Sequence, residues 1–180
     1  FDVASESIFF YKNGDVEEEL DKLKAVTYNL ENGKVVETKL DTKNGVFKET
    51  INKNRFVKKF TLPNIKEGSI IEFEYTVRSD FFWQLDPWIF QGPYPVLWSE
   101  YNLEMPEFLG YTFLTRGYKK YDFTDKKTRT TSFTFTDARG TGASEREQIN
   151  VNVTDHRWVI KGVPALKEEH FTSTLRNHIT

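Results

Sequence analysis

The chain of 180 residues carries 25 basic and 27 acidic side chains, and its formal net charge is −2. This balance leaves no basic surface of the kind that neutralises nucleic-acid phosphates, so we expect no nucleic-acid partner. The sequence contains no cysteine, which excludes disulfides, thiolate metal sites and a cysteine nucleophile within it. Because 16% of the residues are aromatic, disorder is not expected, and the length predicts a single domain, residues 1–180.

No segment of the sequence has the character of a membrane anchor or a leader. A run of 18 apolar residues is absent, so we expect no membrane span. A signal peptide is not recognisable either. Since the first residue is Phe1 and not methionine, we expect the natural start to lie upstream or to have been removed.

The first half of the chain consists of short apolar runs separated by turn residues. Asn32 and Gly33 lie between the runs 23–30 and 34–40, and this pair predicts a two-residue hairpin because both central positions need a positive φ. In residues 70–78 apolar and polar side chains alternate, which predicts an antiparallel strand with one buried face. That face is expected to carry Ile71, Phe73, Tyr75 and Val77. Further strands are expected at residues 7–11, 46–51 and 56–62, the last with Phe56, Lys58, Phe60 and Leu62 on one side.

An aromatic stretch with several prolines, residues 79–106, interrupts this pattern and holds three of the four tryptophans. Proline fixes φ and removes a hydrogen-bond donor, so the middle of the stretch is expected to be neither a helix nor a central strand. We interpret it as a long packed crossover between two strands. The favoured interpretation is that its rings cover the core, since buried aromatic mass is the commoner state. The other is an exposed platform for a sugar ring or a partner's apolar side chain. The candidate binding or interface residues are Trp83, Trp88, Tyr94, Trp98 and Trp158.

The second half continues the series of strands and ends in a segment with little pattern. Strands are expected at residues 96–105, 111–118, 128–136, 147–154 and 156–161, with Phe133 and Phe135 inward. Residues 137–144 are expected to form a turn or loop, and residues 164–171 allow one short helical turn. His156 is interpreted as a surface or edge histidine packed on its neighbour Trp158. Ten or eleven strands with almost no helix predict an all-β fold, a β-sandwich or a closely related two-sheet fold.

Three groups of polar residues have the composition of a chemical site, but their sequence context argues against each. Residues 140–144 resemble a phosphate loop, but a strand follows them where such a loop needs a helix. Glu168, Glu169 and His170, with His178, contain metal-ligating atoms, yet adjacent glutamates point apart, so we expect no metal and no cofactor. Glu100 and Glu104 would lie about 13 Å apart along a strand, which is too far for the carboxylate pair of a glycoside hydrolase. The sequence offers no set of residues that could act together as nucleophile, general base and orienting group, so we expect no catalytic residue.

Four long segments resemble one protein family. They read KLKAVTYNLENGKVVETKL (residues 22–40), KKFTLPNIKEGSIIEFEYTVRSDF (58–81), WIFQGPYPVLWSEYNLEMPEF (88–108) and DHRWVIKGVPALKEEHF (155–171). Together they are similar to a bacterial domain of unknown function found upstream of transglutaminase-like domains in Gram-negative envelope proteins. The resemblance covers roughly residues 8–179, with a poor fit through 119–142.

This resemblance implies an antiparallel immunoglobulin-like β-sandwich, exported to the periplasm or cell envelope and usually followed by a papain-type Cys-His-Asp domain. No catalytic residue is assigned to this domain in that family, so the resemblance implies none in this sequence. A further strand normally follows in that family, so we expect residues 1–180 to be truncated at their C-terminal end. We predict a non-catalytic accessory module, not an enzyme, that positions or docks a downstream transglutaminase- or peptidase-like domain. The alternative is a glycan- or peptide-binding module that uses the Trp-rich surface.

Overall fold

The computed structural model describes residues 4–117, 119–136 and 146–166. Within them the chain forms ten strands, and every strand pairing is antiparallel. The expected all-β class with almost no helix is therefore confirmed. The chain divides into two compact units, Phe1–Leu85 and Asp86–Thr180, which are described separately below. The interpretation of residues 1–180 as one domain stays a prediction.

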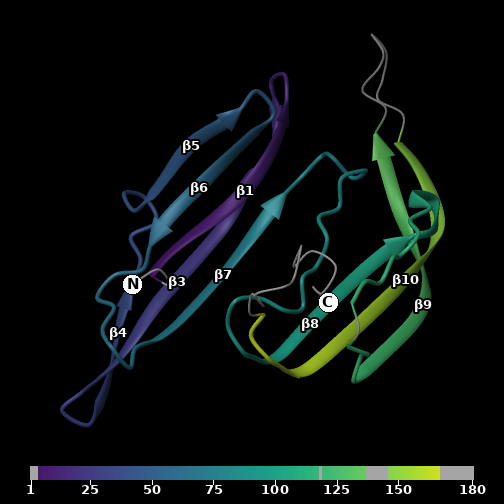
Figure 1. Ribbon diagram of the computed structural model, residues 1–180. Helices are drawn as coiled ribbons and strands as arrows, with labels where there is room; N and C mark the ends of the chain where they lie inside the picture. Colours follow the sequence, from purple (N-terminus) through teal and green to yellow (C-terminus); the bar gives the residue numbers. More distant parts are fainter. Residues whose placement is uncertain (1–3, 118, 137–145, 167–180) are drawn as a thin grey trace, which may run out of the picture. The chain divides into compact units, whose positions relative to one another are not determined.

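The first unit contains two antiparallel sheets. One has the strand order β2-β1-β6-β5 and the other the order β4-β3-β7 (Figure 1). Their bounds are β1 Ser5–Asn13, β2 Val16–Glu17, β3 Glu19–Glu31, β4 Lys34–Lys39, β5 Val46–Asn52, β6 Arg55–Thr61 and β7 Ile70–Arg78. The expected strands of this half are all present. The bounds of β4 to β7 agree with the predicted runs to within one residue. Strands β1 and β3 extend further, because paired backbone continues where the apolar pattern stops.

The predicted hairpin between β3 and β4 is confirmed in its geometry. Asn32 has a φ of 52° and Gly33 a φ of 76°. Glu31 and Lys34 are cross-strand partners directly before and after these two residues. Two consecutive residues in the left-handed region match the right-handed twist of the strands they join, which is why Asn-Gly is favoured there.

One hydrophobic core lies between the two sheets of this unit. Its buried side chains come from β1, β3, β6 and the residue after β6: Ile8, Phe10, Ala25, Phe56, Phe60 and Leu62. Ile71 and Val77 of β7 pack against this core, but Phe73 and Tyr75 between them remain partly exposed. The expected buried face of β7 is thus only half covered. The reason is that β7 is an edge strand, with β3 on one side and no further strand of its sheet on the other.

The second unit contains one antiparallel sheet with the order β8-β10-β9 (Figure 1). The elements are β8 Val96–Pro106, the short 3₁₀ helix η2 Glu107–Leu109, β9 Phe123–Thr136 and β10 Arg146–Val163. Phe90, Ile160 and Val163 form its buried cluster. These side chains are buried because Val96, Tyr101, Tyr121 and Trp158 pack against them.

Two expectations for the second half are wrong. Residues 111–117 form no strand, although their aromatic content suggested one. In the described residues the sheet consists of β8, β10 and β9 alone, so residues 111–117 pair with neither of its two edges. The runs 147–154 and 156–161 are one continuous strand of 18 residues, because both neighbours pair with Thr154 and Asp155 and no turn is formed there. The expected loop at 137–144 and most of the expected helical turn at 164–171 lie outside the described residues.

In the part of the chain that is described, no helix is long and apolar enough to cross a membrane.

Candidate functional site

The crossover, residues 79–95, contains neither helix nor strand, as its prolines predicted. Its rings have two different environments. Phe81 and Phe90 are buried, whereas Trp83, Trp88 and Tyr94 are 59%, 48% and 56% exposed. The favoured interpretation, a cover for the core, therefore describes the two phenylalanines but not the tryptophans. Other large apolar side chains that the crossover leaves exposed are Phe82, Leu85 and Ile89.

On one face of the second unit's sheet, four rings form a continuous aromatic stack. The indole of Trp88 stacks on Tyr101 with 5.5 Å between ring centroids, and Tyr101 stacks on Trp158 at 5.8 Å. Trp158 in turn stacks on His156 at 5.1 Å. Tyr101 and Trp158 are direct cross-strand partners on β8 and β10, which places their rings on the same face. The Nε1 of Trp88 donates a hydrogen bond to Ser99 Oγ at 3.3 Å and so anchors the end of the stack.

The aromatic stack is uncharged at neutral pH. Burial lowers the pKa of His156, and the positive charge of Lys126 acts in the same direction while Asp155 opposes it. Burial also raises the pKa of the Tyr101 hydroxyl. The edge of Phe113 packs against both His156, at 4.8 Å, and Trp158, at 5.3 Å. Packing of His156 on Trp158 is confirmed, but His156 lies on the central strand β10 and not on an edge strand. The stack is a partly exposed, largely apolar surface.

Trp98 lies on the opposite face of the same sheet, because β8 side chains alternate and Trp98 and Tyr101 have opposite parity. Its ring, 47% exposed, contacts Lys161, whose Nζ is 4.8 Å from the Trp98 centroid and 4.5 Å from that of Phe123. The Nε1 of Trp98 donates to Glu100 Oε2 at 2.8 Å. Trp98 therefore lies among polar and charged side chains and does not belong to the aromatic stack.

Glu100 is held by several donors on this polar face. Arg157 donates from Nε at 2.8 Å and from Nη2 at 3.1 Å, and Asn102 donates at 2.9 Å. Arg157 first, then Asn102 and Trp98, lower the pKa of Glu100 to about 2. Glu104 binds a different residue, Arg129, at 2.5 Å. The two carboxylates thus belong to separate ion pairs, and its lowered pKa keeps Glu100 ionised at neutral pH.

The structure does not gather the five sequence-predicted residues into one patch. Trp88 and Trp158 join the aromatic stack through Tyr101, while Trp98 lies on the other face of that sheet. Trp83 belongs to the first unit, where its ring packs edge-on against Phe81 and Phe82. Tyr94 is exposed in the crossover.

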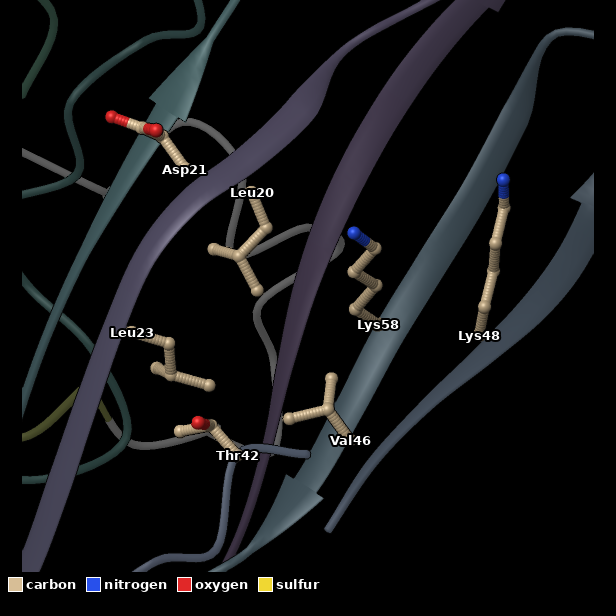
Figure 2. A pocket seen from close by; sticks show the side chains of 7 residues that line it. All are labelled: Leu20, Asp21, Leu23, Thr42, Val46, Lys48 and Lys58. Carbon is tan, nitrogen blue, oxygen red and sulfur yellow. The ribbon is translucent and has the colours of Figure 1, made fainter. Parts of the chain in front are cut away.

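A pocket in the first unit was missed by the sequence analysis. It has a volume of about 350 Å³ and lies between β3 on one side and β5 and β6 on the other (Figure 2). Its lining consists of Leu20, Asp21, Leu23, Thr42, Val46, Lys48 and Lys58. One signal was present: Lys58 shares its parity with Phe56 and Phe60, so a charged residue stands in the inward-facing row of β6.

In the described residues, no group of three or more histidine, aspartate or glutamate side chains could hold a metal ion. The rejected phosphate loop at 140–144 lies outside those residues, as do Glu168, Glu169, His170 and His178.

The described residues define an all-β protein built from antiparallel sheets, with exposed aromatic residues and a pocket that combines apolar and cationic side chains. Comparison with protein families shows which domain this is. Residues 4–165 match the family described as a Domain of Unknown Function with solved structure, DUF3857, and the chain belongs to that family. Searches of curated proteins and of solved structures gave no match. The resemblance to a domain of unknown function is confirmed, and the transglutaminase context stays a prediction.

Proposed function

We propose that the chain is a non-catalytic accessory module that positions or docks a downstream transglutaminase- or peptidase-like domain of a larger, exported envelope protein. The observation that supports this proposal is the apolar surface of the crossover. Trp88, Ile89 and Tyr94 are exposed although each is large and apolar or aromatic. Exposed apolar surface of this kind marks interaction sites, and aromatic residues are enriched in interface cores.

We further propose that the sandwich is of the immunoglobulin-like type. The first unit supports this with four strands in one sheet and three in the other, around a shared core. Seven antiparallel strands in two facing sheets are typical of the constant-type arrangement of that class.

The aromatic stack makes the second unit well suited to docking. Trp88, Tyr101 and Trp158 restrain one another through stacking at 5.5 and 5.8 Å. Side chains that are already ordered lose little conformational entropy when a partner binds, so more of the contact energy is retained. Tryptophan and tyrosine are also the residues that most often dominate binding energy.

The docking proposal is tested in the parent polypeptide with a paired substitution, Trp88→Ala with Ile89→Ala. We expect the downstream domain to lose about 2 kcal/mol or more of docking energy, seen as a lower melting temperature and faster proteolysis of that domain. The matched control is Leu30→Ala with Val35→Ala, a cross-strand pair that is also apolar and exposed, on the β3–β4 hairpin. A downstream domain that keeps full stability and activity after removal of residues 1–180 refutes the proposal.

A second candidate function, glycan or peptide binding, is favoured by the surroundings of Trp98. A half-exposed indole beside Glu100, Asn102 and Arg157 combines an apolar face with planar hydrogen-bonding groups. Sites for small ligands combine these features. Tryptophan fluorescence should then change on titration with a polysaccharide panel, and Trp98→Ala should abolish the change while Trp83→Ala preserves it. No change across the panel argues against this function.

A further inference from the structure

The pocket of the first unit combines an apolar wall with two lysines. Leu20 and Leu23 of β3 point into the space from one sheet, and Val46 and Lys58 face it from the other (Figure 2). Both leucines and Val46 also pack against the hydrophobic core. The wall of the pocket is therefore an extension of that core and is held in place by it.

Lys48 and Lys58 are cross-strand partners, so both amines project from the same face of the sheet. That face is the inner one, since Phe56 and Phe60 of the same row are fully buried. The Nζ of Lys48 lies 4.0 Å from the ring centroid of Phe56, and that of Lys58 lies 5.3 Å from Phe10. Like charges placed directly opposite each other destabilise a sheet unless something compensates them.

The compensation that the chain itself supplies is incomplete. Glu17 pairs with Lys48 at 2.8 Å. The pKa of Glu17 is lowered, first by Lys48 and then by the charges of Lys12 and Lys58, so three lysines act on one carboxylate. Among the described residues, no carboxylate lies within ion-pair distance of Lys58.

Asp21 is the only acidic residue in the lining, and it does not neutralise Lys58. Its carboxylate pairs with Arg78 at 3.4 Å. Figure 2 shows its side chain at the margin of the pocket, on the far side of β3 from Lys58. The pocket is therefore left with an excess of positive charge next to apolar side chains.

We propose that this pocket binds a small amphiphilic anion. Its carboxylate or phosphate group pairs with Lys58, beside Lys48, and its short alkyl or acyl chain lies against Leu20, Leu23 and Val46. A partly buried ammonium without an anionic partner is unfavourable, and an anionic headgroup removes that cost. The volume of about 350 Å³ is at the small end of the range for ligand pockets, which limits the chain to a short one. The site uses none of the residues proposed for docking, so either proposal can fail alone.

Isothermal titration calorimetry on the full chain tests this proposal with four probes. Octanoate and octyl phosphate combine a charge with an alkyl chain, acetate provides the charge alone, and octyl glucoside provides the chain alone. We expect both amphiphilic anions to bind with a stoichiometry of one, and the other two to bind at least about tenfold more weakly. Tighter binding of octyl phosphate identifies a phosphate headgroup, and tighter binding of octanoate identifies a carboxylate. Acetate binding as tightly as octanoate overturns the proposal.

A pair of adjacent lysine variants locates the site. Lys58→Met keeps the aliphatic stem and removes the charge, and should weaken octanoate binding by about tenfold. Lys59→Met is the matched control: Lys59 is the next residue of β6, points to the outer face and pairs with Glu49 at 2.5 Å. We expect no effect of that change on binding. An equal loss in both variants overturns the proposal.

Methyl NMR of the unmodified chain provides a test that needs no variant to fold. Octanoate should shift the methyl resonances of Leu20, Leu23 and Val46 more than those of Leu30 and Val35 on the distant hairpin. Absence of binding by either amphiphilic anion, or shifts confined to other residues, overturns the proposal.

Discussion

Replacement of Phe56 by alanine tests whether the two sheets of the first unit share one core. The Phe56 side chain is 0% exposed, and its ring stacks on Phe10 with 5.0 Å between centroids. Removal of such a ring costs about 3–5 kcal/mol through lost burial and the cavity that remains. Loss of stacking adds to this, so we expect a value in the upper part of that range. This is a large fraction of the roughly 5–15 kcal/mol that stabilises a typical domain.

The assay is urea unfolding followed by far-UV circular dichroism. With a denaturant slope of about 2 kcal/mol/M, the midpoint of Phe56→Ala should fall by roughly 2–2.5 M. The matched control is Phe47→Ala on the neighbouring strand β5, where the side chain is 67% exposed. That variant should stay within about 0.5 kcal/mol of the unmodified chain. Equal midpoints for the two variants would refute the assignment of Phe56 to a core shared by the sheets.

Two further predictions concern a turn and an ion pair. Gly33→Ala places a Cβ at a φ of 76° and should destabilise the fold by about 1–2 kcal/mol in the same urea assay. Gly92→Ala, with open space at the Cβ position, should be neutral. Equal effects of the two substitutions would contradict the hairpin geometry. Its hydrogen bonds with Arg157, Asn102 and Trp98 lower the pKa of Glu100 from 4.5 to about 2. The ion pair of Glu100 with Arg157 therefore stabilises the fold fully above pH 4.5, and this contribution is lost as the pH falls toward 2. Glu100→Gln should flatten the dependence of melting temperature on pH in this window, and a Glu100 carboxyl midpoint near 4.5 in an NMR titration would contradict the ion pair.

The candidate surface could be predicted from the sequence only in part. The aromatic stretch at residues 79–106 identified Trp88 as a surface candidate, and Trp158 was selected separately. Their association depends on Tyr101, which is the cross-strand partner of Trp158. That partnership follows from the register of β8 on β10, and register between strands distant in sequence is set by the whole sheet. The same alternation that unites these residues places Trp98 on the opposite face.

The pocket shows a similar division between local pattern and tertiary context. The inward parity of Lys58 was visible in the sequence, because Phe56 and Phe60 flank it at a spacing of two. The pattern could not indicate which residues surround Lys58 in the folded chain. Lys48 faces it across β5 and β6, and Leu20 and Leu23 belong to the other sheet. Only the packing of one sheet on the other places this partly buried lysine in a pocket beside a second one.

By itself, the sequence determined the all-β class, the strands of the first half and the hairpin at Asn32 and Gly33. These features depend on side-chain alternation and turn residues, which act between neighbours along the chain. The tertiary structure alone decided that residues 146–163 form one strand, that residues 111–117 form none, and that a pocket lies between the sheets. The physical reason is that a strand exists only when another strand satisfies its backbone hydrogen bonds, and that partner can come from anywhere in the chain.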